Sequence, residues 1–166
     1  MPVLGPSGAL SAMARHRFSV NRMIAGTAVD WSTRGTEAIL DQLRDNGATA
    51  ARPFGMPPVA ALADAVVHAI DVRRPLGLAH DVPPDALASV AGFALATPGP
   101  LAGVIGGSAR RRVSGVRLVV PDADWSWGSG PDVTLSVEAA LRLVYHRPVT
   151  ADELAGPGAA VLEPRL

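Results

Sequence analysis

The chain changes its sequence pattern at Ser114-Gly115, and this change limits the folds that it can adopt. Before this point, apolar residues recur at three- and four-residue spacing between prolines and glycines, which predicts a series of short helices. After it, the segment GVRLVVPDADWSWGSGPDVTLS alternates around Pro-Asp and Gly-Ser-Gly turns, which predicts short strands. We therefore expect an α+β protein with a helical domain over residues 1–113 and a small α/β domain over residues 114–166.

Proline and glycine residues set the boundaries of the expected elements. Asn46-Gly47 is a helix stop signal, Pro84 suits the first turn of a helix, and a residue that precedes proline is pushed out of the helical region. The expected helices cover residues 9–31, 36–47, 58–73, 84–95, 97–112 and 137–146, and a closing strand covers residues 158–164.

Composition excludes several classes of function. The 15 basic residues balance 15 acidic ones, so the formal net charge is zero and nothing favours nucleic acid or an anionic membrane as a partner. The absence of cysteine excludes a thiolate nucleophile within the chain, so thiol chemistry would need an external thiol. No apolar stretch reaches the ~18 residues of a membrane span, and the N-terminus lacks a basic signal-peptide region. We expect a soluble cytoplasmic protein.

Three polar side chains, Asp64, His68 and Asp71, interrupt the apolar helix expected over residues 58–73. At about 100° per residue they share a stripe roughly 60° wide, and the other faces are apolar. This pattern predicts a helix surrounded by protein, with the stripe pointing into a cavity or bundle interior. A carboxylate buried there is costly unless it is paired, hydrogen-bonded or bound to a metal.

Two interpretations meet that requirement. In the first, Asp64 and His68 bind one metal ion from adjacent helical turns, and Asp71 is a third ligand or orients the imidazole. In the second, His68 and Asp71 hydrogen-bond each other, Asp64 meets an arginine and no metal is involved. The spacing alone has low specificity and does not decide between them.

Three stretches carry a family resemblance: LADAVVHAIDVRRPLG (residues 62–77), RHRFSVNRM (15–23), and GGSARRRVSGVRLVVPDADWSWGSGP with DELAGPG (106–131 and 152–158). They resemble the maleylpyruvate isomerase family of mycothiol-dependent proteins from high-GC actinobacteria, which is related to DinB-like metal-binding bundles. The resemblance implies a DinB-like helical bundle followed by a small α/β domain, with a divalent metal, expected to be zinc, and mycothiol as cofactors. Asp64 and His68 match the acid and histidine that the family places four residues apart, and Asp71 would orient a ligand.

The chain departs from this family at its N-terminal end. The family supplies a further histidine from its second bundle helix, upstream of the position matched by Met1-Pro2, and this sequence has no equivalent. His16 is not expected to replace it, because RHRFSVNRM aligns beyond the metal-binding helix. We therefore expect a truncated bundle with an incomplete metal site, arising from a start too far downstream or from a remnant.

The resemblance implies an enzyme that uses a metal-activated thiol for isomerisation or S-transfer on a small electrophilic substrate. Arg73 and Arg74 follow the helix of the metal pair, where they would either complement its negative end or hold a carboxylate of the substrate or thiol. The alternative is a non-catalytic helical interaction protein with an orphaned metal half-site. Such a protein would pair with another chain, a second copy included, through the face left by the missing helix.

Overall fold

The structure, a computed structural model, describes residues 5–52, 55–78 and 82–166. The chain forms two compact units, Met1–Pro58 and Val59–Leu166. Helices in both units and a small mixed sheet in the second confirm the α+β class. The division at Pro58 differs from the boundary expected after residue 113, because residues on both sides of residue 113 share one hydrophobic core.

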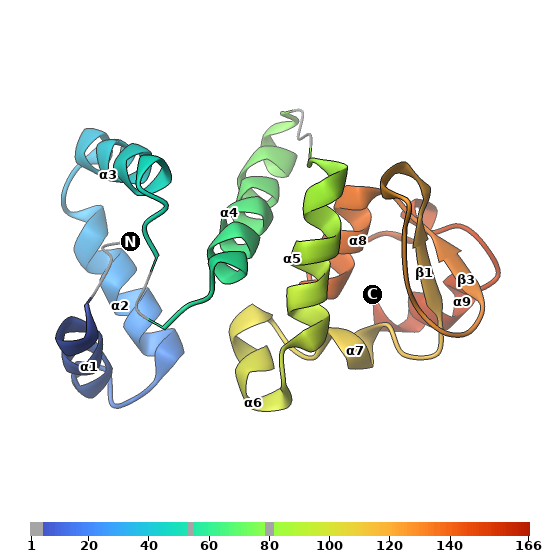
Figure 1. Cartoon of the computed structure of the whole chain (residues 1–166), viewed down its shortest axis with the longest axis horizontal. Helices are drawn as coiled ribbons and strands as arrows, with labels where there is room; N and C mark the ends of the chain where they lie inside the picture. The colour runs from blue at the N-terminus through green and yellow to red at the C-terminus, as the bar shows by residue number, and fades with distance from the viewer. Residues whose placement is uncertain (1–4, 53–54, 79–81) are drawn as a thin grey trace. The chain divides into compact units, whose positions relative to one another are not determined.

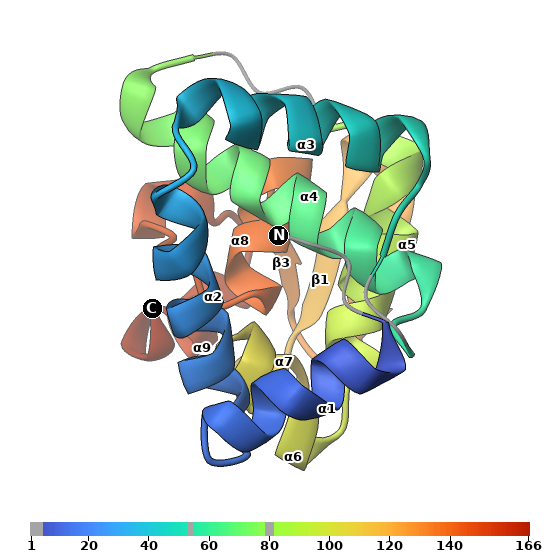
Figure 2. The ribbon, with the colours of Figure 1, turned by 90° about the vertical axis from the view of Figure 1, so that its left-hand side faces the viewer.

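Three helices make up the described part of the first unit. They are α1 (Pro6–Arg15), α2 (Val20–Ser32) and α3 (Thr36–Ala48). Within this unit α2 runs between α1 and α3 along the chain (Figure 2). No residue of these three helices is buried, so the unit presents amphipathic helices without a hydrophobic core of their own.

The single helix expected over residues 9–31 is wrong, because the chain breaks between α1 and α2. Arg17 and Phe18 adopt φ angles of 55° and 56°, in the left-handed region. Ser19 then caps α2, its hydroxyl oxygen accepting a hydrogen bond from the Arg22 N–H at 3.4 Å. No glycine marks this break in the sequence, so the continuous apolar pattern concealed it.

The remaining helices belong to the second part of the chain. They are α4 (Pro58–Arg73), α5 (Pro84–Ala96), α6 (Gly99–Ala102), α7 (Ala109–Arg112), α8 (Val137–Val144) and α9 (Ala159–Leu162), with single 3-10 turns at Arg74–Leu76, Gly103–Ile105, Pro121–Ala123, Ala151–Glu153 and Glu163–Arg165. Helices α4, α5 and α8 lie next to one another (Figure 1). Within the described residues, no helix is long and apolar enough to cross a membrane.

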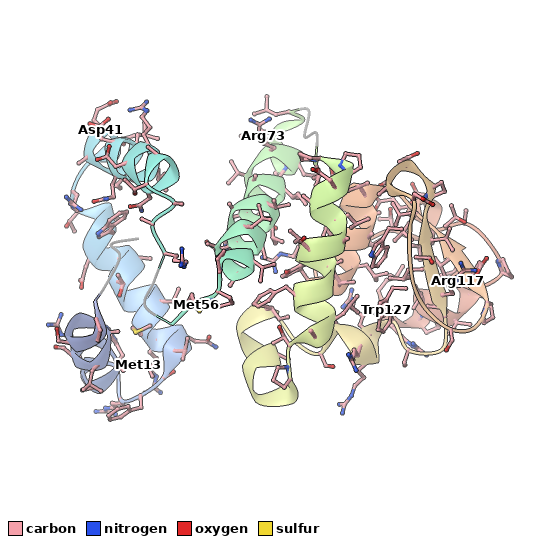
Figure 3. All side chains as sticks on the ribbon, in the orientation of Figure 1. Met13, Asp41, Met56, Arg73, Arg117 and Trp127 are labelled. Carbon is pink, nitrogen blue, oxygen red and sulfur yellow. The ribbon has the colours of Figure 1, made fainter. Side chains whose placement is uncertain are left out.

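A three-stranded sheet follows α7. Its strands are β1 (Arg117–Val120), β2 (Trp125–Gly128) and β3 (Asp132–Thr134). The central strand β1 pairs antiparallel with β2 and parallel with β3, so Leu118 lies opposite both Trp127 and Val133. These strands confirm the alternation expected after residue 114. Trp127 packs against the hydrophobic core from the edge strand (Figure 3).

Two other expected elements differ from the structure. The helix expected over residues 97–112 is divided into α6, a 3-10 turn and α7, because Gly106 and Gly107 both adopt positive φ. The closing strand expected over residues 158–164 is instead the short helix α9, which buries Leu162. A run of four apolar residues is too short for its periodicity to distinguish a strand from a helix.

The core of the second unit lies between α5, α8 and the sheet, and buried residues of α4 belong to the same cluster. Leu87 of α5, Leu118 of β1 and Leu141 of α8 are completely buried in one cluster. Beside them the Tyr145 hydroxyl donates a hydrogen bond to the Val90 carbonyl at 2.9 Å. This core buries one face of α4.

Candidate functional site

Helix α4 positions the three polar residues singled out in the sequence. Proline suits its first turn, where a missing N–H costs nothing, and its many alanines favour the helical conformation. Its buried residues follow one narrow stripe: Ala60, Ala63, Val67 and Ile70. His68 lies roughly 140° around the axis from Ala63, so the polar stripe faces away from the core.

Exposure of this stripe contradicts the expectation that it points into a cavity. The side chains of Asp64 and His68 are 76% and 61% exposed, and only Asp71, at 33%, is half-buried. The physical reason is the abundance of alanine around these residues. Alanine is apolar but costs little at a helix surface, so the pattern did not require burial on every face.

His68 nevertheless lies between two carboxylates of its own helix. Asp64 Oδ1 is 3.4 Å from His68 Nε2, and His68 Nδ1 donates a hydrogen bond to Asp71 Oδ2 at 3.1 Å. A carboxylate only accepts hydrogen bonds, so Nδ1 carries a proton. Nε2 faces Asp64, to which it donates when the ring is protonated and presents a lone pair when the ring is neutral.

Asp71 is itself held by Arg147, a residue that the sequence analysis missed. Arg147 Nε and Nη2 donate to Asp71 Oδ1 and Oδ2 at 3.1 and 2.9 Å, and its Nη1 donates to the Tyr145 carbonyl at 2.8 Å. The hydrogen bonds from Arg147, with a further one from His68, hold the pKa of Asp71 below its ordinary value. The pair is separated by 76 residues, so no local pattern could have indicated it.

Arg73 and Arg74 lie at the end of α4, where Figure 3 labels Arg73. Arg74 Nη1 is 3.3 Å from Glu138 Oε1, and its Nη2 is 3.7 Å from Glu153 Oε1. Arg142, only 3% exposed, pairs with the same two carboxylates. Arg74 thus belongs to a network of two arginines and two glutamates, which favours a structural role for it over a role in binding an anion.

The network makes stability depend on pH through Glu153. Burial raises the pKa of this carboxyl, but hydrogen bonds from Arg142 and Thr150 lower it to about 2, below the usual value of 4.5. A pKa that folding lowers stabilises the protein at pH values above the unfolded-state pKa, and this stabilisation is lost as the pH falls through about 2.

We expect Glu153→Gln to cost about 2 kcal/mol of unfolding free energy at pH 7 and almost nothing at pH 2. Urea denaturation between pH 2 and pH 7 measures this loss of unfolding free energy. Asp152→Asn, at an exposed neighbouring carboxylate, is the control. An equal loss at both pH values would contradict stabilisation by the charged Glu153 carboxylate.

Apart from the network around Arg142, His146 contacts Arg112 of α7. Arg112 Nη1 lies 3.2 Å from His146 Nδ1, and as an obligate donor it assigns the neutral imidazole proton to Nε2. Burial first, and then the charge of Arg112, lowers the pKa of His146. The His146 ring lies against Gly107, where a Cβ would collide with it.

Asp64 and His68 of α4 are the candidate metal ligands, and the described residues add no third beside them. Within these ranges no group of three histidine or acidic side chains is arranged to hold a metal ion. Asp71 is engaged with the opposite ring nitrogen of His68 and with Arg147. His16 belongs to the first unit, where its ring lies against Gly26.

Comparison of the chain with family models, with curated proteins and with solved structures gives no match.

Proposed function

We propose that the protein is a mycothiol-dependent, divalent-metal-binding protein of the maleylpyruvate isomerase family, in which Asp64 and His68 are metal ligands and Asp71 positions His68. The observation that carries this proposal is the 3.4 Å separation of Asp64 Oδ1 and His68 Nε2. Zinc–ligand bonds of about 2.0–2.2 Å at a tetrahedral angle place two ligand atoms about 3.4 Å apart. The pair therefore has the spacing of two ligands of one ion.

The opposite side of the imidazole also fits a metal ligand. Histidines that bind metals commonly donate their other ring N–H to a carboxylate, which fixes the tautomer and the ring orientation. His68 Nδ1 donates to Asp71, which Arg147 holds with two further hydrogen bonds. This chain of contacts keeps Nε2 directed toward Asp64.

A zinc ion at this pair would act as a Lewis acid that holds an external thiol as thiolate. The chain has no cysteine of its own, which fits a thiol supplied by mycothiol. A cytoplasmic location is part of the proposal, because thiols stay reduced there. Two protein ligands are fewer than the three of a catalytic zinc site, so the reaction and its substrate, a small electrophile, rest on the family resemblance alone.

Zinc binding tests the proposal directly. We expect purified protein to bind zinc, His68→Ala to abolish binding, and Asp71→Asn to weaken it about 10–100-fold by releasing the imidazole. Elemental analysis and calorimetric titration measure these effects. His16→Ala is the matched control, because it removes a histidine of the other unit and should leave the affinity unchanged.

The thiol is tested on the same protein with cobalt(II) in place of zinc. Coordination of mycothiol would add a sulfur-to-cobalt charge-transfer band to the spectrum, and His68→Ala would remove it. Absence of metal binding, or binding that survives His68→Ala, would exclude the metal site.

A non-catalytic interaction protein is the second candidate function, and exposed apolar residues favour it. Leu62 and Val72 of α4 are 42% and 62% exposed, and the helices of the first unit bury no residue. Apolar surface of this kind on a soluble protein ordinarily has a partner. Failure to bind metal would leave this function as the better one.

A further inference from the structure

We propose that His146 is a pH-sensitive switch that holds a glycine loop, residues 106–108, against the end of α8 while its imidazole is neutral and releases this loop when the imidazole is protonated. The loop directly precedes α7, and all of these residues belong to the second unit. The switch involves neither Asp64 nor His68, so it goes beyond the proposed function.

His146 occupies a backbone position at the end of α8 that ordinarily suits glycine. Its φ of 59° lies in the left-handed region. Its N–H donates to the Leu143 carbonyl at 3.3 Å, and the Arg147 N–H donates to the Arg142 carbonyl at 2.8 Å, a pair of hydrogen bonds that ends many helices. A side chain at this φ is strained, because its Cβ crowds the backbone. Contacts of the imidazole have to offset this strain.

The glycine loop is shaped to receive the imidazole. Gly106 and Gly107 adopt φ angles of 98° and 137°, conformations that residues with side chains rarely take. A Cβ on Gly107 would lie 2.9 Å from His146 Cε1 and 3.1 Å from Nε2, so the ring lies where a side chain at Gly107 would be. The Gly107 N–H donates to the Ala102 carbonyl at 2.8 Å, and this hydrogen bond reports whether the loop is in place.

The polar contact of the imidazole exists only in its neutral form. Arg112 Nη1 lies 3.2 Å from His146 Nδ1, and a guanidinium has no acceptor, so Nδ1 must be unprotonated. A proton on Nδ1 removes this hydrogen bond and leaves two cations in contact at a partly buried place. Protonation therefore replaces an attraction by a repulsion where α7 meets α8.

The charged groups around His146 are mainly positive. Arg112 of α7, the Ser108 backbone of the glycine loop and the neighbouring Arg147 face the ring. The carboxylate of Asp71 on α4 already accepts two hydrogen bonds from Arg147. Within the described ranges of the chain, no carboxylate forms an ion pair with Arg112 or His146. A second positive charge on the imidazole thus has no partner to compensate it.

These contacts fix the direction in which pH acts. Burial first, and then the charge of Arg112 and that of Arg147, lower the pKa of His146 below its ordinary 6.5, and a hydrogen bond with the Ser108 backbone opposes them in part. A histidine whose pKa is lower in the closed form favours the open form increasingly as the pH falls below 6.5. The loop is therefore held at neutral pH and released in mild acid.

The hydrophobic core confines the opening to the loop and the imidazole. Ala109 and Val113, on either side of Arg112, are 1% and 0% exposed and belong to this core. Their burial does not depend on the charge of His146, so they hold α7 in place. Val144 holds the last turn of α8 in the same way. Release moves the residues before α7 and leaves the core intact.

Amide hydrogen exchange of the full chain, followed by NMR and corrected for the intrinsic exchange rate at each pH, measures the opening. Between about pH 7.5 and about pH 5.5 the protection of the Gly107 N–H should fall at least about threefold, while the Leu118 N–H of β1 keeps its protection. NMR titration of the imidazole protons should give His146 a pKa below 6.5.

Variants separate the charge of the imidazole from its bulk. His146→Gln cannot be protonated and should make the protection of Gly107 independent of pH. His146→Gly suits the left-handed φ, so it folds, and should leave Gly107 weakly protected at both pH values. Arg112→Gln removes the neighbouring cation and should raise the pKa of His146 toward 6.5. His16→Gln, the same substitution in the first unit, is the matched control and should keep the pH dependence.

Protection of Gly107 that does not change with pH, or that changes equally in His146→Gln, would overturn the switch. A parallel loss of protection at Leu118 would also overturn it, because acid would then unfold the core as a whole. These outcomes do not involve zinc, so they leave the test of the proposed metal pair separate.

Discussion

Arg142→Ala is expected to lower the free energy of unfolding by about 3–5 kcal/mol. The guanidinium of Arg142 is 3% exposed and pairs with Glu138 and Glu153, and it also donates to the Pro148 carbonyl. Its removal leaves two acidic side chains facing each other with only the half-exposed Arg74 beside them. Urea denaturation at pH 7, followed by tryptophan fluorescence, measures the loss.

Two further variants separate the lost network from a general effect of removing an arginine. Arg111→Ala removes an exposed arginine of α7 and should change stability by less than about 0.5 kcal/mol. Arg142→Lys keeps the charge but lacks the planar fork that contacts several acceptors, so it should recover only part of the loss. A cost below about 1 kcal/mol for Arg142→Ala would show that the network contributes little.

This network illustrates what the sequence could not reveal. The helix expected over residues 137–146 is confirmed by α8, because its apolar spacing is a local signal. Arginine is ordinarily a surface residue, and nothing in that spacing indicates that Arg142 is buried. Its burial depends on Pro148 and Glu153, which the chain brings back over α8 after the helix has ended.

Local signals also explain which boundaries could be predicted. Proline and glycine marked the ends of α3 and α4, so these two helices were expected close to where the structure has them. The break at Arg17 and Phe18 has no such mark, because ordinary residues there adopt a conformation that glycine usually takes. The division of the chain at Pro58 is a property of packing, which periodicity does not report.

The candidate site, too, could be predicted only in part from the sequence. Helical geometry alone predicted that Asp64, His68 and Asp71 share one stripe, and their contacts confirm it. Its direction relative to the core was predicted wrongly, since alanine makes an exposed face look apolar. Of the two interpretations left open, the contact of His68 with Asp71 belongs to both, whereas Arg147 reaches Asp71 and not Asp64. Asp64 lies beside His68, a contact that either a shared metal ion or a direct ion pair between the two side chains accounts for.

Leu118→Ala is expected to cost about 3 kcal/mol of unfolding free energy, whereas Leu43→Ala should cost less than about 0.5 kcal/mol. Leu118 is completely buried on the central strand, opposite Trp127 and Val133, so its truncation leaves a cavity that the sheet cannot close. Leu43 of α3 is 53% exposed. Urea denaturation followed by tryptophan fluorescence measures both variants.

The comparison works because the same side-chain atoms are removed in both units. Identical chemistry cancels the intrinsic difference between leucine and alanine, apart from their helix and strand propensities of a few tenths of a kcal/mol. What remains is the environment of each side chain. A large cost at Leu43 would mean that this residue is buried in the solution protein, and that the first unit takes part in a core beyond the one formed by residues 59–166. A small cost at both positions would instead show that the sheet is not part of the cooperative core.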